Sequence, residues 1–192
     1  MTQVGFYFDM TKCSGCRVCQ VVCKDRNNLD VGIRYREVHT YTVGSFPNVS
    51  GYNYSGACNH CADPACLAAC PAGAIHKLAD GTVVIDQETC IGCGTCVRTC
   101  PYGAPKLDPA VGVSGKCDGC YTLRAKGEQP ACVTSCLCRA LDFGDLDELA
   151  AKYGDDFVRD VCVLPDSGQT DPSLLIRAKD AAFEESFKEM IL

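Results

Sequence analysis

Cysteine constrains the fold of this chain more than any other residue type, because 18 of its 192 residues are cysteine. Sixteen of them fall into four groups of four. Within every group, two residues separate the first pair of cysteines and three residues separate the last pair. The groups are Cys13, Cys16, Cys19 and Cys23 (group one); Cys58, Cys61, Cys66 and Cys70 (group two); Cys90, Cys93, Cys96 and Cys100 (group three); and Cys117, Cys120, Cys132 and Cys136 (group four).

Groups one and three, CSGCRVCQVVC and CIGCGTCVRTCP, have the spacing C-x2-C-x2-C-x3-C, which binds 4Fe-4S clusters in bacterial ferredoxins. A loop with this spacing points three thiolates at one cluster, and small residues such as Gly15, Gly92 and Gly119 let the backbone approach it closely. The fourth cysteine starts a helical turn and ligates the other cluster of a pair. Four groups therefore predict two modules and four 4Fe-4S clusters.

An internal repeat supports this interpretation. The segment YFDMTKCSGC matches VIDQETCIGC at an offset of 77 residues, which aligns Asp9 with Asp86. An alanine also follows the fourth cysteine at one fixed distance in groups two, three and four: Ala74, Ala104 and Ala140. This distance selects Cys136 rather than Cys138 as the fourth cysteine of group four.

Disulfides and zinc are the two other uses of so many cysteines. A disulfide framework requires an oxidising compartment, and C-x2-C-x2-C runs place thiols too close together to pair well with distant partners. Zinc takes four ligands, usually from two pairs, and has no use for a third cysteine two residues on followed by C-x3-C-P. The spacing therefore favours iron–sulfur clusters over both.

Short strands and helices are expected between the groups. The runs VGFYF and TVVI predict strands ahead of groups one and three, RYREVHTYTV predicts strands in the long connection after group one, and GDLDELAAKYG predicts a short helix. DAAFEESFKEMIL predicts an amphipathic terminal helix whose face of Phe183, Phe187 and Ile191 packs on a partner or on the chain itself. Cys162 is expected to be a small buried core residue.

The remaining composition limits the function. A formal net charge of −6 argues against nucleic acid as a partner, because binding a polyphosphate requires a basic face. The start MTQVGFYFDM does not resemble a secretory signal, and no run of 18 apolar residues predicts a membrane span. His39, His60 and His76 lie apart, with His60 expected to have a packing role, and no nucleophile elbow, P-loop or dinucleotide fingerprint occurs. We therefore expect no catalytic site on this chain.

Four groups in this order and with these gaps resemble the electron-transfer subunits of the DMSO reductase family of molybdenum enzymes. The resemblance lies in CNHCADPACLAACPAGAIHK, CIGCGTCVRTCPYGAP, KCDGCY and RALDFGDLDEL, and it covers about residues 4–150. It implies an α+β fold of two pseudo-symmetric bacterial 2x[4Fe-4S] ferredoxin-like modules with inserted loops and a helical C-terminal tail. The implied divisions are module 1 at 1–33 plus 111–150, a connecting insertion at 34–57, module 2 at 58–110, and a partner-contacting C-terminal extension at 151–192.

The same resemblance implies that groups one and four share module 1, and that groups two and three share module 2. A related branch has a tryptophan in group three and a 3Fe-4S cluster, but Cys93 and Cys96 are both present here, so all four clusters are expected to be 4Fe-4S. Cys138 and Cys162 are expected to be non-ligands. The implied ligand sets are Cys13, Cys16, Cys19 and Cys136 (cluster a); Cys117, Cys120, Cys132 and Cys23 (cluster b); Cys58, Cys61, Cys66 and Cys100 (cluster c); and Cys90, Cys93, Cys96 and Cys70 (cluster d).

The resemblance also implies a place in a larger complex. The clusters would relay single electrons between a quinol or soluble donor and a catalytic subunit with a molybdenum bis-pterin guanine dinucleotide centre, in some complexes with a quinol-binding membrane anchor subunit. Two alternatives stay open, namely a wire subunit of a formate dehydrogenase or hydrogenase complex and a free polyferredoxin shuttle. Assembly is expected in the cytoplasm. The subunit would then stay there or be exported with a twin-arginine partner to the outer face of the cytoplasmic membrane.

Overall fold

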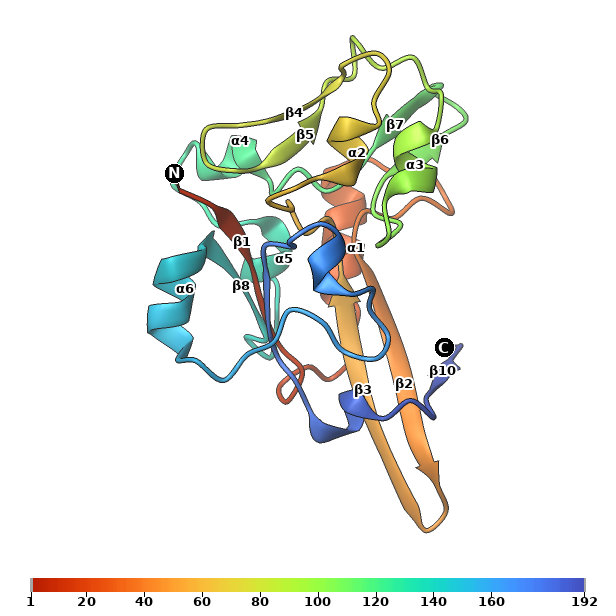
Figure 1. Ribbon diagram of the computed structural model, residues 1–192, viewed down its shortest axis with the longest axis vertical. Coiled ribbons are helices and arrows are strands. Elements are labelled where there is room, and N and C mark those ends of the chain that lie inside the picture. Colours follow the sequence, from red (N-terminus) through yellow and green to blue (C-terminus); the bar gives the residue numbers. More distant parts are fainter. Residues whose placement is uncertain (1, 192) are drawn as a thin grey trace.

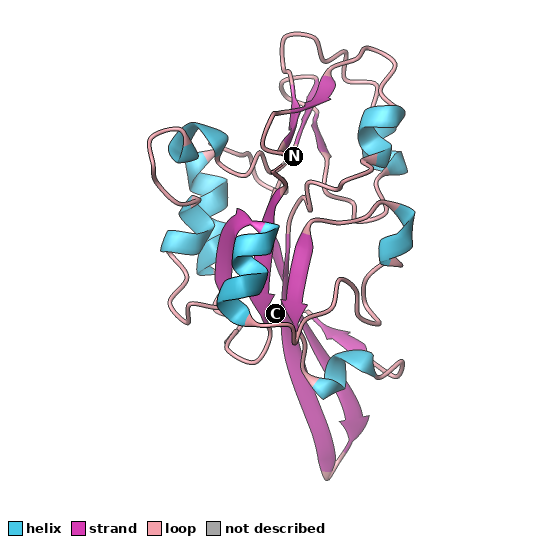
Figure 2. Ribbon diagram, turned by 60° about the vertical axis from the view of Figure 1, so that its left-hand side comes forward, coloured by secondary structure: helices cyan, strands magenta, loops and turns pink. Residues whose placement is uncertain are grey.

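The computed structural model describes residues 2–191, which form short helices and small sheets joined by long loops (Figures 1 and 2). The predicted α+β class is thereby confirmed. The strands are β1 (Val4–Asp9), β2 (Glu37–Ser45), β3 (Asn48–Gly56), β4 (Ile75–Lys77), β5 (Val83–Ile85), β6 (Lys106–Asp108), β7 (Val113–Gly115), β8 (Leu141–Asp145), β9 (Leu174–Arg177) and β10 (Lys188–Met190). The helices are α1 (Val18–Arg26), α2 (Ala65–Ala68), α3 (Thr95–Thr99), α4 (Tyr121–Arg124), α5 (Ala131–Thr134) and α6 (Leu146–Tyr153), with single 3₁₀ turns η1 (Ser167–Gln169) and η2 (Asp180–Phe183).

A three-stranded sheet in the order β8-β1-β9 forms the main core, with β1 antiparallel to β8 and parallel to β9. All six residues of β1 are buried. The Phe6 ring meets the Phe143 ring of β8 edge-on, with centroids 4.6 Å apart. The pairing of β1 with β8 joins the strand before group one to the strand after group four.

Two short hairpins lie on either side of group three. Strand β4, after group two, pairs antiparallel with β5, and β6 pairs antiparallel with β7 before group four. Both predicted strands, VGFYF and TVVI, are therefore present, as β1 and β5.

Asp145 caps the predicted helix α6, since its side chain accepts hydrogen bonds from the backbone N–H groups of Asp147 and Glu148.

The long hairpin β2–β3 extends away from the rest of the molecule (Figure 1). Its strands pair from Glu37 and Gly56 at the base to Ser45 and Asn48 at the turn. Near the base, tyrosine and valine side chains pack into the main core, whereas Phe46 at the turn is 92% exposed. This hairpin confirms the strands predicted in RYREVHTYTV.

The C-terminal segment differs from the prediction. Residues 180–190 form η2 and strand β10 instead of an amphipathic helix, and β10 pairs antiparallel with β2. The Phe187 ring meets the Tyr41 ring edge-on at a centroid distance of 5.7 Å, whereas Phe183 and Ile191 are largely exposed. Pairing with an available sheet edge therefore prevails over the helical spacing of the apolar residues.

Cys162 is also not the buried core residue that its apolar neighbours suggest. Its neighbour Val161 is buried, while Cys162 itself is exposed and its backbone N–H donates a hydrogen bond to the Ala182 carbonyl. Within residues 2–191, no helix is long and apolar enough to cross a membrane.

Candidate iron–sulfur cluster sites

The first three cysteines of group one meet the fourth cysteine of group four. Cys13, Cys16, Cys19 and Cys136 line one cavity, together with apolar side chains of β1 and β8. Cys138 lines the same cavity, and its thiol contacts the Ser14 hydroxyl at 3.4 Å. The fold therefore brings together the four residues expected to hold cluster a, with the expected non-ligand beside them.

Groups two and three exchange their fourth cysteines in the same way. One cavity is lined by Cys58, Cys61, Cys66 and Cys100, and a second by Cys90, Cys93, Cys96 and Cys70. Helices α2 and α3, which end just before Cys70 and Cys100, pack against each other. This helix pair carries each fourth cysteine across to the cavity of the other group.

The remaining set joins Cys23 to Cys117, Cys120 and Cys132. Helix α1, which contains Cys23, packs on α5, which contains Cys132. Burial, opposed by the charge of Arg36 and assisted by negative charge on Cys132 and Cys120, raises the pKa of the Cys23 thiol to about 12. Burial, and after it negative charge on Cys23 and Cys132, likewise raises the pKa of the Cys117 thiol well above its ordinary value. All four predicted sets are thus brought together.

The loops of the four groups share one backbone feature. The residue before the second cysteine has a φ in the left-handed region in every group: Gly15 (74°), His60 (45°), Gly92 (65°) and Gly119 (62°). Glycine suits this conformation because it has no Cβ. In groups one and three, moreover, the aspartate carbonyls of Asp9 and Asp86 accept hydrogen bonds from the N–H groups of Cys13 and Cys90. The repeat predicted from sequence is therefore also a structural repeat at these two loops.

The backbone conformation after the fourth cysteine also repeats, in groups two, three and four. Gly73, Gly103 and Arg139 all lie in the left-handed region three residues after the fourth cysteine, and each donates its N–H to that cysteine's carbonyl. Ala74, Ala104 and Ala140, which come next, are buried. Arg139 therefore occupies the position that glycine has in groups two and three, and Cys136 is the structural counterpart of Cys70 and Cys100.

The donors around the cavities suit an iron–sulfur cluster. Backbone N–H groups of Gly119, Ser114 and Ala140 donate to cysteine sulfurs, which stabilises thiolate charge. Within residues 2–191, no three His, Cys, Asp or Glu side chains are close enough to bind a single metal ion.

Burial raises the pKa of several of these thiols. It raises the pKa of Cys13 and Cys61 to about 11 and that of Cys66 to about 12. Cys93 is exposed, and the Thr95 hydroxyl and backbone N–H lower its pKa. Because thiolates are the metal ligands, insertion of a cluster must release protons from the buried thiols.

Two cations are buried among the cysteines. Lys116 donates from Nζ to the carbonyl oxygens of Val83 and Cys117, and it borders the cavity of Cys58 and Cys66. Arg36 lies 2% exposed near the thiols of groups one and four. Sequence reasoning did not identify Arg36, because it lies outside every cysteine group. Its only sequence signal is an arginine at the start of a predicted strand.

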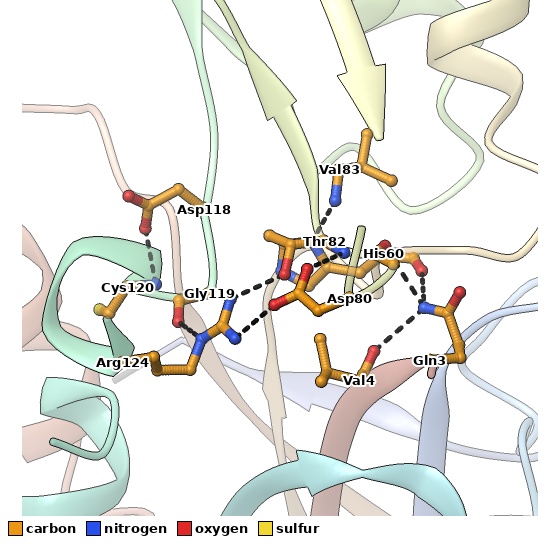
Figure 3. Close-up of polar contacts among 11 residues, drawn as sticks. Gln3, Val4, His60, Asp80, Thr82, Val83, Asp118, Gly119, Cys120 and Arg124 are labelled. Atoms are coloured by element: carbon orange, nitrogen blue, oxygen red, sulfur yellow. Dashed lines mark hydrogen bonds and ion pairs between the residues drawn. The ribbon is translucent and has the colours of Figure 1, made fainter. Parts of the chain in front are cut away.

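A polar network joins the turn between β4 and β5 to the first loop of group four (Figure 3). The Arg124 guanidinium donates to the Asp80 carboxylate at 2.6 Å, the Thr82 hydroxyl at 2.7 Å and the Gly119 carbonyl at 2.8 Å. Burial opposes the ionisation of Asp80, but the hydrogen bonds from Arg124 and Thr82 lower its pKa. The network therefore connects the β4–β5 turn to the Cys117–Cys120 loop.

His60 belongs to the same region and has the packing role expected for it. Its ring is fully buried, and Nδ1 accepts a hydrogen bond from the backbone N–H of Val83 at 3.1 Å (Figure 3). Burial and the nearby charges of Lys116 and Arg124 lower its pKa well below the ordinary value. His60 is therefore neutral at pH 7.

Known protein families match the chain over most of its cysteines. A family described as a 4Fe-4S dicluster domain matches residues 49–146, and one described as a 4Fe-4S binding domain matches residues 10–32. The chain belongs to the 4Fe-4S dicluster family. This assignment confirms 4Fe-4S clusters as the cofactors, and the sixteen grouped cysteines provide for four of them.

Individual family members are similar over nearly the whole chain. The B subunit of the anaerobic dimethyl sulfoxide reductase of Haemophilus influenzae is 44% identical over 92% of this chain and 90% of its own length. The corresponding B subunit from Escherichia coli is 45% identical over 92% of this chain and 89% of its own length. The formate dehydrogenase-O iron-sulfur subunit of Escherichia coli is 35% identical over 77% of this chain and 55% of its own length. The predicted resemblance to subunits of the DMSO reductase family is thereby confirmed.

Proposed function

We propose that this chain is a non-catalytic electron-transfer subunit that relays single electrons between a quinol or soluble donor and a molybdopterin catalytic subunit of an anaerobic reductase. The observation that supports this most directly is a set of three cavities, in each of which three cysteines of one group meet the fourth cysteine of another. Bound clusters would supply one-electron redox chemistry. The likeness to the B subunits of dimethyl sulfoxide reductases supports the choice of complex.

We further propose that the four cysteine sets are the ligands of four separate clusters, a to d. In this role the chain's thiolates hold the iron, its backbone N–H groups donate to sulfur, and its apolar side chains exclude water. We also propose the two-module division, with module 1 at 1–33 plus 111–150 and module 2 at 58–110. The pairings of β1 with β8 and of β4 with β5 support it, since each pairing joins strands of one module.

The proposed partner is a subunit with a molybdenum bis-pterin guanine dinucleotide centre, with a quinol-binding membrane anchor as a further partner. The chain itself has no membrane-spanning helix among the described residues. Cluster insertion would take place in the cytoplasm, with the complex staying there or crossing with a twin-arginine partner. The C-terminal extension at 151–192 is the proposed partner contact, and β10 would present it from the edge of the long hairpin.

A wire subunit of a formate dehydrogenase complex is the second candidate, because the formate dehydrogenase-O iron-sulfur subunit is 35% identical over 77% of this chain. Purification of the native complex distinguishes the two roles. We expect the chain to co-purify with a molybdenum–pterin subunit that reduces a sulfoxide or N-oxide and does not oxidise formate. An isolated 20 kDa species with all its iron would instead indicate a free shuttle, and nickel in the complex would indicate a hydrogenase.

Metal analysis of the anaerobically purified chain tests the clusters directly. We expect about 16 iron atoms and about 16 acid-labile sulfides per chain, because each of four cubane clusters contains four of each. Zinc serves as the internal control in the same measurement. A zinc-dominated composition, or about 8 iron atoms, would contradict four 4Fe-4S clusters.

A further inference from the structure

Arg36 immediately precedes β2, and its side chain points into the main core instead of into solvent. The side chain is 2% exposed, and its guanidinium carbon lies 4.4 Å from the centroid of the Phe6 ring. Nη1 donates to the carbonyl and the hydroxyl of Ser55 at 2.9 and 3.0 Å. Within residues 2–191, Nε and Nη2 have no hydrogen-bond partner. The side chain thus keeps unused donors in a buried position.

The surroundings of Arg36 contain thiols and no paired acid. Among the described residues, no carboxylate forms an ion pair with it. The groups that act on its charge are Cys19 of the cluster a set, and Cys23, Cys117 and Cys132 of the cluster b set. Ser55, which anchors the guanidinium, also contacts the Cys19 sulfur at 3.4 Å. Arg36 therefore lies between two ligand sets.

A buried arginine without a counter-charge is unstable, because removing a cation from water costs several kcal/mol that only an opposite charge and hydrogen bonds can offset. Burial disfavours the charge of Arg36, and only the thiolate forms of Cys132, Cys117, Cys19 and Cys23 would favour it. Two anionic, thiolate-bound clusters on either side would supply the missing charge. The unused Nε and Nη2 donors would then face cluster or cysteine sulfur.

We propose that the buried positive charge of Arg36 raises the reduction potentials of clusters a and b. This inference rests on the proposed ligand sets. A reduced cluster carries one more negative charge than an oxidised one, so a nearby buried cation stabilises the reduced form. Because the cation acts on both clusters, it raises the potentials of both.

Lys116 provides an instructive contrast. It is similarly buried, but its ammonium group already donates to two backbone carbonyls, so its donors are used in holding the chain. Arg36 uses only Nη1 in this way. A planar guanidinium can bind backbone with one nitrogen and present two others to a second group.

The test is a redox titration of the full-length, cluster-loaded chain, monitored by electron paramagnetic resonance, for wild type, Arg36→Met and Arg36→Lys. Lys126→Met, which removes an exposed cation next to group four, is the matched control. For Arg36→Met we expect two of the four clusters to show a reduction equilibrium constant about tenfold lower, equal to a potential about 59 mV lower. The other two clusters, and all four in the Lys126→Met variant, should shift less than about twofold because water screens an exposed charge.

Each outcome decides the inference. A shift of all four clusters together, or of none, would overturn it, whereas wild-type potentials in Arg36→Lys with a shift in Arg36→Met would support it. If Arg36→Met does not retain its iron, the Arg36→Lys variant decides. Full iron content with unchanged potentials in Arg36→Lys supports the role of the charge. Loss of iron from Arg36→Lys overturns it, because that variant keeps the charge and changes only the shape of the side chain. A wild-type chain without four clusters would refute the proposed function instead, which separates the two failures.

Discussion

Replacing Cys136 with alanine is expected to remove one of the four 4Fe-4S signals of the chain, whereas Cys138→Ala should leave all four. Cys136 is the structural counterpart of Cys70 and Cys100, because Arg139 and Ala140 repeat the backbone that follows those residues. A cubane that loses one thiolate loses either the iron it held or the whole cluster. Iron should therefore fall by between about one and four atoms per chain in Cys136→Ala. Iron and sulfide analysis with electron paramagnetic resonance of the reduced protein measures this.

The proximity of Cys138 makes the double variant informative. Because Cys138 lines the same cavity, its thiol is the one available to replace a missing ligand of cluster a. Four intact signals in Cys136→Ala, followed by the loss of one in Cys136→Ala with Cys138→Ala, would show such a replacement. Loss of a cluster in Cys138→Ala alone, with Cys136→Ala unaffected, would contradict the assignment of the fourth ligand.

The cysteine groups were predictable from sequence because their geometry is local. The spacing of the first three cysteines and the residue before the second one describe one loop around one cavity, and the alanine after the fourth cysteine marks where the chain turns back at the neighbouring cavity. The backbone keeps its conformation even where the residue differs. His60 adopts the left-handed conformation of the glycines before the second cysteine, and Arg139 that of the glycines three residues after the fourth cysteine. Sequence comparison among the four groups is therefore enough to align them.

The features that sequence reasoning missed depend on contacts between distant segments. Arg36 is buried because the base of the long hairpin packs on β1, and a single strand pattern does not show which end of that hairpin is covered. The spacing of Phe183, Phe187 and Ile191 fits a helix, but the free edge of β2 was available for pairing. Cys162 has apolar neighbours that pack in or against the core, yet its own side chain is exposed.

The Arg124→Met variant is expected to destabilise the loaded chain by about 2 kcal/mol, because three hydrogen bonds are lost and buried polar groups are left without partners. Arg124 is 18% exposed and its guanidinium also lies 4.9 Å from the centroid of the Phe143 ring. Its loss leaves the fully buried Thr82 hydroxyl without this donor and the Asp80 carboxylate without its ion pair. The joint between the β4–β5 turn and the Cys117–Cys120 loop should therefore loosen first.

Thermal bleaching of the visible cluster absorbance, at one fixed heating rate, measures this loss. A change of about 2 kcal/mol in a chain of this size lowers the midpoint by about 4 to 8 °C. Arg26→Met is the matched control. Arg26 is exposed, and among the residues that the structure describes its side chain donates only to the Thr122 hydroxyl, so the midpoint of this variant should change by less than about 2 °C. Asp80→Asn combined with Arg124→Met should cost less than the sum of the single changes, because the two residues form one ion pair. Equal midpoints for Arg124→Met and Arg26→Met would show that the network in Figure 3 does not hold the β4–β5 turn and the Cys117–Cys120 loop together.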